Sequence, residues 1–258
     1  MTASAPSPPG GPSESDRTGT TAAGAAGAGT LPEPQVQAMF DRIARVYDRM
    51  NAVMTAGLDR RWRERAADLA AVSPGDRALD VATGTGDLAL ELARRVAPGG
   101  EVVGADFSEA MLEIARTKAP GGAVRFEAAN ALELPYRDDE FDAATVGFGA
   151  RNFSDLPRGL AEMVRVVRPG GRVVVLEITT PTRPPLSMLL GLWFDRIVPA
   201  LGRLAGDPDA YEYLPNSVRR FPGPEQLAAI LYACGLRDVS YRLTAGGIIA
   251  LHVGTVSS

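Results

Sequence analysis

Apolar residues recur along this chain at two different periods, and the change of period separates its parts. Near the beginning they recur every three or four residues, which predicts an amphipathic helix. The apolar positions of that helix are Val36, Met39, Phe40, Ile43, Val46, Tyr47 and Met50. A second helix is expected over residues 60–71, ending before Ser73-Pro74-Gly75-Asp76.

From residue 77 onward, short strand-like runs alternate with helical segments. Repeated alternation of this kind predicts a parallel sheet between layers of helices. Ser108 suits the N-cap of one helix, and Pro169-Gly170-Gly171 should end another helix and begin the next strand. The expected strands are residues 77–82, 101–106, 124–128, 141–148 and 172–178.

The last part of the chain differs. After a helix over residues 224–234, two strands at 239–243 and 248–253 flank Thr244-Ala245-Gly246-Gly247, which predicts a hairpin. One of these two strands should therefore run antiparallel to the rest. A mostly parallel, seven-stranded sheet closed by such a hairpin favours the methyltransferase version of the doubly wound, Rossmann-like α/β fold over the dehydrogenase version.

Composition divides the 258 residues into a tail and one domain. Residues 1–32 are almost all Ala, Gly, Ser, Thr and Pro, so we expect a disordered tail, and residues 33–258 form the domain. The tail lacks the pattern of a secretory signal. A net charge of −4 argues against a nucleic-acid partner, and the single cysteine, Cys234, favours a reducing cytoplasm.

A glycine-rich turn and a later carboxylate carry the first chemical signal. Gly84 and Gly86 follow the first strand, which lets a ligand approach the backbone closely. Asp106, about 20 residues on at the end of the next strand, can accept hydrogen bonds from ribose hydroxyls. The pattern predicts an adenosyl cofactor, and by itself leaves open an NAD-dependent dehydrogenase.

Three further stretches resemble the family of ubiquinone and menaquinone biosynthesis C-methyltransferases (UbiE/MenG), over residues 36–254. They are Tyr47-Asp48-Arg49-Met50-Asn51 with Trp62, Phe148-Gly149-Ala150-Arg151-Asn152, and Arg165-Val166-Val167-Arg168-Pro169-Gly170-Gly171. Two positions depart from the family pattern. Thr179 replaces a serine but keeps the hydroxyl, whereas Gly147 replaces a cofactor-site serine and removes its side chain.

The resemblance implies that the cofactor is S-adenosylmethionine, bound by Thr85, Asp106, Asn130 and Ala131 together with the turn glycines. Thr85 should meet the methionine carboxylate, and Asn130-Ala131 the adenine edge. Asn130 is alternatively a turn-forming residue. For Asp80, a bond to the methionine ammonium and an inward structural hydrogen bond remain equal alternatives.

The resemblance also implies methyl transfer to a ring carbon of a prenylated hydroquinone. We expect Arg151 to hold the oxyanion of the substrate, Asn152 to orient Arg151, and Tyr47 to contact the substrate hydroxyl. A structural ion pair is the alternative for Arg151, and core packing for Tyr47. Asp48 is a candidate base, with a surface or capping residue as its equal alternative, and His252 fits the core better than it fits a base.

The apolar segment within residues 183–222 is expected to cover the substrate. A packed internal helix, a peripheral contact with the inner face of the membrane and a homodimer contact are the alternatives that the sequence leaves open. A prenylated naphthoquinol, demethylmenaquinol, is the preferred substrate. A benzoquinol, a small aromatic metabolite and a catalytically silent quinone-binding scaffold are the competing interpretations.

Overall fold

A computed structural model gives the structure of this protein, and it describes residues 32–119, 121–122, 124–181, 184–193, 196 and 208–257. Residues 1–31 of the expected tail and part of the apolar segment lie outside the described residues.

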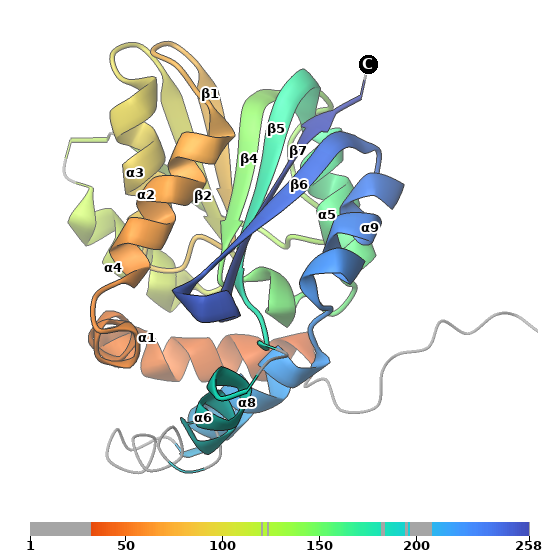
Figure 1. The fold of residues 1–258 in the computed structure, drawn as a ribbon. Coiled ribbons are helices and arrows are strands. Elements are labelled where there is room, and N and C mark those ends of the chain that lie inside the picture. Colours follow the sequence, from red (N-terminus) through yellow and green to blue (C-terminus); the bar gives the residue numbers. More distant parts are fainter. Residues whose placement is uncertain are drawn as a thin grey trace, which may run out of the picture. The chain divides into compact units, whose positions relative to one another are not determined.

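One mostly parallel sheet forms the centre of the described chain, with strand order β3-β2-β1-β4-β5-β7-β6 (Figure 1). Its strands are β1 (Arg77–Val81), β2 (Glu101–Asp106), β3 (Arg125–Ala128), β4 (Phe141–Gly147), β5 (Val167–Ile178), β6 (Leu236–Thr244) and β7 (Ile249–Val256). Within this sheet β7 runs antiparallel to both of its neighbours, β5 and β6. The predicted fold class, including the terminal hairpin, is confirmed.

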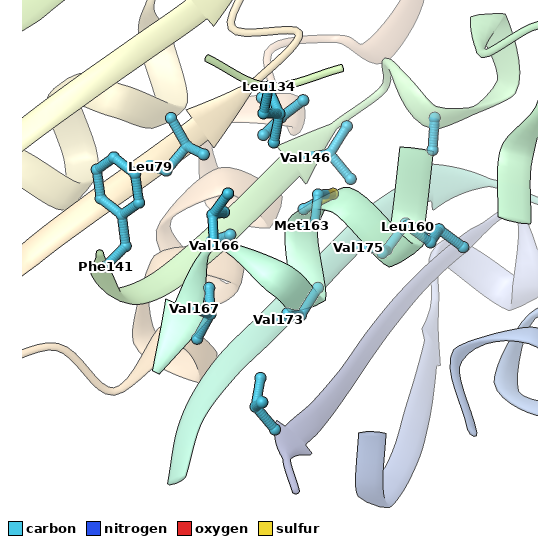
Figure 2. Close-up of a cluster of buried hydrophobic side chains, with 14 of the residues drawn as sticks. Leu79, Leu134, Phe141, Val146, Leu160, Met163, Val166, Val167, Val173 and Val175 are labelled. Carbon is cyan, nitrogen blue, oxygen red and sulfur yellow. The ribbon is translucent and has the colours of Figure 1, made fainter. Parts of the chain in front are cut away.

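Alternate residues of the central strands enter two separate buried clusters, as the two-residue period of a strand requires. In β1, Leu79 and Val81 belong to one cluster and Ala78 to the other. The first cluster packs against α5 (Leu156–Arg165) and α9 (Pro224–Ala233), and Figure 2 shows Leu160 and Met163 of α5 within it. The second packs against α2 (Asp59–Ala70), α3 (Asp87–Val96) and α4 (Glu109–Lys118).

Three further helices gather at the edge where the parallel strands end. They are α1 (Glu33–Thr55), α6 (Leu186–Leu192) and α8 (Pro208–Arg220), and α1 runs along that edge in Figure 1. They form a third apolar cluster around Val36, Met39, Leu190 and Val218. A lid of helices therefore covers the edge at which doubly wound proteins bind ligands.

The predicted helices agree with the structure to within a few residues, but the predicted start of the fifth strand at residue 172 is wrong. β5 begins at Val167, which lies opposite Phe141 of β4. The next pair of opposite residues is Arg172 of β5 and Ala143 of β4, so the register shifts between them. The intervening Pro-Gly-Gly sequence thus lies in a bulge inside the strand. Gly171 is required there because a Cβ would lie 2.5 Å from the Asp142 carbonyl oxygen.

Candidate active site

Two adjoining cavities lie at the carboxyl edge of the sheet, next to α1. The polar cavity, about 90 Å³, is lined by residues 80–85, Asp87, Asp106, Asn130 and Ala131, among others. The apolar cavity, about 400 Å³, is lined mainly by residues of α1, α2, α6 and α8. The two cavities share Phe40, Tyr47, Arg63 and Phe148 in their walls.

The turn between β1 and α3 needs both of its glycines. Gly84 has φ +55° and Gly86 has φ +84°, in the left-handed region that favours glycine. A Cβ on Gly86 would lie 2.8 Å from the Phe126 ring, whereas a Cβ on Gly84 would meet no atom within 4 Å. Gly84 lines the polar cavity and leaves its backbone open to a ligand, while Gly86 permits close packing.

Asp106 lies in the wall of the polar cavity and is only 5% exposed. Its two oxygens accept backbone N–H groups from Gly84 at 2.7 Å and Ser108 at 2.9 Å. Burial raises the pKa of Asp106 to about 6, although these donors oppose the rise. Each carboxylate oxygen keeps a second lone pair for a ligand hydroxyl.

Asp80, near the end of β1, makes inward structural hydrogen bonds, which was one of its two predicted alternatives. It also lines the polar cavity. The hydroxyls of Thr83 and Thr145 donate to its two oxygens at 2.6 and 2.7 Å. Burial raises the pKa of Asp80 to about 6, and the two hydroxyls counteract part of that rise. Each oxygen of the carboxylate keeps a second lone pair, so the contact between Asp80 and the methionine ammonium stays a prediction.

The Thr85 hydroxyl connects the turn to α1 and α4. It donates to Asp48 at 2.6 Å and accepts from Lys118 at 2.9 Å, while Lys118 also pairs with Asp87 at 2.8 Å. Asp48, for which the sequence left a base and a surface or capping residue as alternatives, therefore holds α1 against the turn. Binding of the cofactor by Thr85 stays a prediction.

Asn130 forms the Asx turn that was its sequence alternative, and it also lines the polar cavity. Its side-chain oxygen accepts the Leu132 N–H at 2.9 Å, and its amide nitrogen donates to Glu33 of α1 at 3.3 Å. Ala131 lines the same wall. The structure thus brings the predicted adenine-site residues to the cavity, where their contacts with adenine stay predictions.

Arg151 forms the buried ion pair that was its sequence alternative. Its Nη1 lies 2.9 Å from the Glu177 carboxylate and also donates to the Phe148 carbonyl oxygen. Burial acts to lower the pKa of Arg151, but the charge and hydrogen bond of Glu177, together with Tyr47 and Tyr213, outweigh burial and leave that pKa raised. Arg151 also lines the apolar cavity, so the ion pair and a contact with the acceptor are compatible.

Asn152 and Tyr47 both lie in the walls of these cavities. The Asn152 oxygen accepts the Tyr213 hydroxyl at 3.1 Å, and orientation of Arg151 by Asn152 stays a prediction. Asn152 lines the polar cavity, and Tyr47 lines both cavities while packing edge-to-face against Phe40. His252 is fully buried, with Nε2 2.9 Å from the Pro224 carbonyl oxygen, and lines neither cavity.

Sequence reasoning missed Arg63 of α2. It is 8% exposed, lies in the shared wall, donates to Asp59 and has its guanidinium carbon 5.5 Å from the Phe148 ring centroid. Arg63 sits in a run of charged residues, which reads as an exposed helix face. The available signal was the i, i+4 spacing from Asp59, next to the apolar Trp62.

Comparisons with known proteins agree with this geometry. Residues 29–256 match the ubiE/COQ5 methyltransferase family. A demethylmenaquinone methyltransferase of Thermus thermophilus is 51% identical, over 84% of this chain and 99% of its own. A ubiquinone/menaquinone biosynthesis C-methyltransferase UbiE of Geobacter sulfurreducens is 42% identical, over 85% of this chain and 88% of its own.

Solved structures share the fold at low identity. A SAM-dependent methyltransferase of Thermotoga maritima matches with a TM-score of 0.61 and 19% identity, over 85% of this chain and 98% of its own. The [4+2]-cyclase SpnF matches with a TM-score of 0.66 and 20% identity, over 88% and 98%. The second match shows that this fold also hosts other chemistry.

The sheet order, the glycine turn and the buried Asp106 define a SAM-dependent methyltransferase of the doubly wound class. The match over nearly the whole described chain then gives the particular family: this protein belongs to the ubiE/COQ5 methyltransferase family. Its cofactor is S-adenosylmethionine. The cavity residues fit that group, because Gly84 leaves room beside the backbone and Asp106 offers acceptors for ribose hydroxyls.

Proposed function

We propose that this protein methylates a ring carbon of demethylmenaquinol and so completes menaquinone. The observation that carries this proposal is the apolar cavity of about 400 Å³, which shares a wall with the polar cavity. An aromatic ring with an apolar tail suits such a cavity, whereas a small polar acceptor does not. The names of the relatives support a naphthoquinol in particular.

The reaction needs an activated ring carbon. That carbon becomes nucleophilic when the neighbouring hydroxyl, with a phenol-like pKa near 10, loses its proton. S-adenosylmethionine held at the polar cavity would supply the methyl group, its sulfur–methyl bond breaking as the new carbon–carbon bond forms, and the ring carbon would then release its proton. Arg151 cannot act as the base, since its guanidinium does not give up a proton. It can stabilise the oxyanion, and Tyr47 can contact the same oxygen.

We further propose that the protein meets its substrate at the inner face of the membrane. Apolar residues are exposed on elements that contribute to the wall of the apolar cavity, namely the end of α1, the following turn and α6: Val53, Leu58, Met188 and Leu192. No helix among the described residues is long and apolar enough to cross a bilayer. The proposed contact is peripheral, and a homodimer through this end is the alternative.

Mass spectrometry of reduced demethylmenaquinone, incubated with the protein and S-adenosylmethionine, tests the reaction. We expect a gain of one methyl group on the ring carbon, and no gain with the oxidised quinone, which has no hydroxyl to deprotonate. A benzoquinol run in parallel measures the competing substrate. Cofactor binding without any methylated product from either quinol would refute the proposed acceptors.

A further inference from the structure

Arg63 occupies a position that neither the sequence patterns nor the proposed reaction has given a role. It projects from α2 into the wall between the polar and apolar cavities. Its Nη1 donates to Asp59 and lies 3.9 Å from an oxygen of Asp87. Burial acts to lower the pKa of Arg63, but these two carboxylates outweigh burial and leave that pKa raised.

Acidic side chains outnumber basic ones in the wall of the polar cavity. Among the described residues that line it, the acidic ones are Glu33, Asp80, Asp87 and Asp106, and the one cation is Arg63. S-adenosylmethionine carries a carboxylate at its methionine end. Placing that carboxylate beside these acidic side chains without a cation would be unfavourable, because like charges repel and burial strips its water.

Arg63 also lies at the end of the cavity that the methionine group should occupy. Asp106, the last residue of β2, is the predicted acceptor for ribose, whereas Asp80 is the second-last residue of the neighbouring strand β1. The charge of Arg63 lowers the pKa of Asp80 and so opposes part of the effect of burial. A cation and an anion beside each other match the carboxylate and ammonium of an amino acid.

The guanidinium retains donors for a ligand. Arginine has five N–H donors, and Asp59 accepts from Nη1. In the described part of the chain, the fully buried side-chain nitrogens without a partner belong to Arg151 and His252. Since Arg63 has no such atom, each of its guanidinium nitrogens either has a hydrogen-bond partner or is accessible to solvent or a ligand. Arg151 is no rival for this role, because it is paired with Glu177 and lines the apolar cavity.

We propose that Arg63 binds the carboxylate of S-adenosylmethionine, with Asp80 on the ammonium of the same methionine group. The pair would recognise the amino-acid end of the cofactor, separately from the recognition of ribose by Asp106. This assignment concerns cofactor binding alone and does not depend on which quinol is the acceptor.

Ligands that differ in the carboxylate provide the test. Isothermal titration calorimetry would compare wild type, Arg63→Ala and Arg63→Lys with S-adenosylhomocysteine, decarboxylated S-adenosylmethionine and methylthioadenosine. Arg63→Ala should weaken S-adenosylhomocysteine about 10- to 100-fold, the range of a charge-assisted contact, and leave the two ligands without a carboxylate nearly unchanged. Arg63→Lys keeps the charge but loses the planar fork, so its loss should be smaller and show the same selectivity.

Arg61→Ala, a change at an exposed position of the same helix, is the matched control and should alter no affinity. Binding of methylthioadenosine by each variant reports that the cavity is folded. Equal weakening of all three ligands would make Arg63 a structural residue. Unchanged affinity for S-adenosylhomocysteine in both variants, with or without a raised KM for the quinol, would also overturn the proposal.

Discussion

At the scale of single residues, Arg151 and Glu177 form a buried pair whose parts cannot be removed independently. The two side chains are 7% and 1% exposed. Removing one partner of such a pair leaves an uncompensated charge and costs about 3–5 kcal/mol, whereas replacing both with neutral groups is much less harmful. A single substitution of Arg151 therefore changes stability as well as any interaction with the substrate.

We predict that Arg151→Ala lowers turnover at least about tenfold, as the loss of an oxyanion contact does, with the Kd of S-adenosylmethionine nearly unchanged. It should also lower the melting temperature. The double variant Arg151→Met/Glu177→Gln should recover most of the stability but not the turnover. Steady-state kinetics and thermal unfolding of both variants measure this. Recovery of turnover together with stability would make Arg151 purely structural.

The two buried carboxylates of the polar cavity predict a pH dependence. The pKa values of Asp80 and Asp106 are raised to about 6 in the folded protein, above their values of about 4 in the unfolded chain. The stability that they contribute is thus fully present below about pH 4 and is lost as pH rises through about 6. Binding of a ligand that needs ionised carboxylates has the opposite pH dependence, because it is favoured at a pH above these pKa values.

We therefore expect the affinity for S-adenosylmethionine to fall as pH drops from 7.5 to 5.5, measured by calorimetry. Methylthioadenosine, which lacks the methionine end, reports the ribose site near Asp106 alone. Asp80→Asn is compatible with its two hydroxyl partners, since hydroxyls both donate and accept, and it should make the pH dependence shallower for S-adenosylmethionine only. Flat affinities over this range in wild type would contradict the raised pKa values as a control on binding.

At the scale of elements, α1 is held over the polar cavity by hydrogen bonds to the loops that line it. These contacts are Gln37 to the Phe107 carbonyl at 2.7 Å, Ser108 to Asp41 at 2.5 Å, Thr85 to Asp48 at 2.6 Å and Ser154 to Glu33 at 2.5 Å. The cavity beneath, about 90 Å³, is smaller than the roughly 300 Å³ at which ligand pockets begin. Movement of α1 is the simplest way to admit the cofactor.

We predict that Asp48→Ala loosens α1 and speeds release of the cofactor about tenfold, as loss of a hydrogen bond to a charged group allows. Hydrogen exchange should increase in α1 but not in the sheet. Arg45→Ala, at an exposed position of the same helix, serves as the control. Stopped-flow displacement measures the rate. Unchanged exchange in α1 together with an unchanged rate would show that this contact does not govern opening.

At the scale of the whole molecule, periodicity was enough to predict the sheet and its closing hairpin, because alternation along each strand is a local property. The turn of Gly84 and Gly86 and the position of Asp106 could be predicted likewise, since parallel strands bring their ends to one edge. The partners of Arg151 and Asp48 could not be predicted. Glu177 and Lys118 are far from them along the chain and meet them only through tertiary packing. Arg63 was missed because it lies in a run of charged residues, and the sequence does not show which of these residues is buried by tertiary packing.

The apolar end of the molecule provides the last prediction. Met188 of α6 and Val53 of α1 are 72% and 61% exposed on helices that line the apolar cavity, and Tyr232 of α9 is 69% exposed on a helix that lines neither cavity. A lipid surface at the cavity would shield the first two residues and let a prenylated quinol enter without crossing water.

Met188→Glu/Val53→Glu should therefore reduce sedimentation with phospholipid vesicles and raise the KM for a long-tailed quinol in those vesicles. A short-tailed analogue in solution should be methylated at the wild-type rate, and Tyr232→Glu should change neither property. Light scattering distinguishes the alternative: vesicle binding unaffected by the double variant, with a dimer converted to a monomer, would assign this surface to a second copy of the chain.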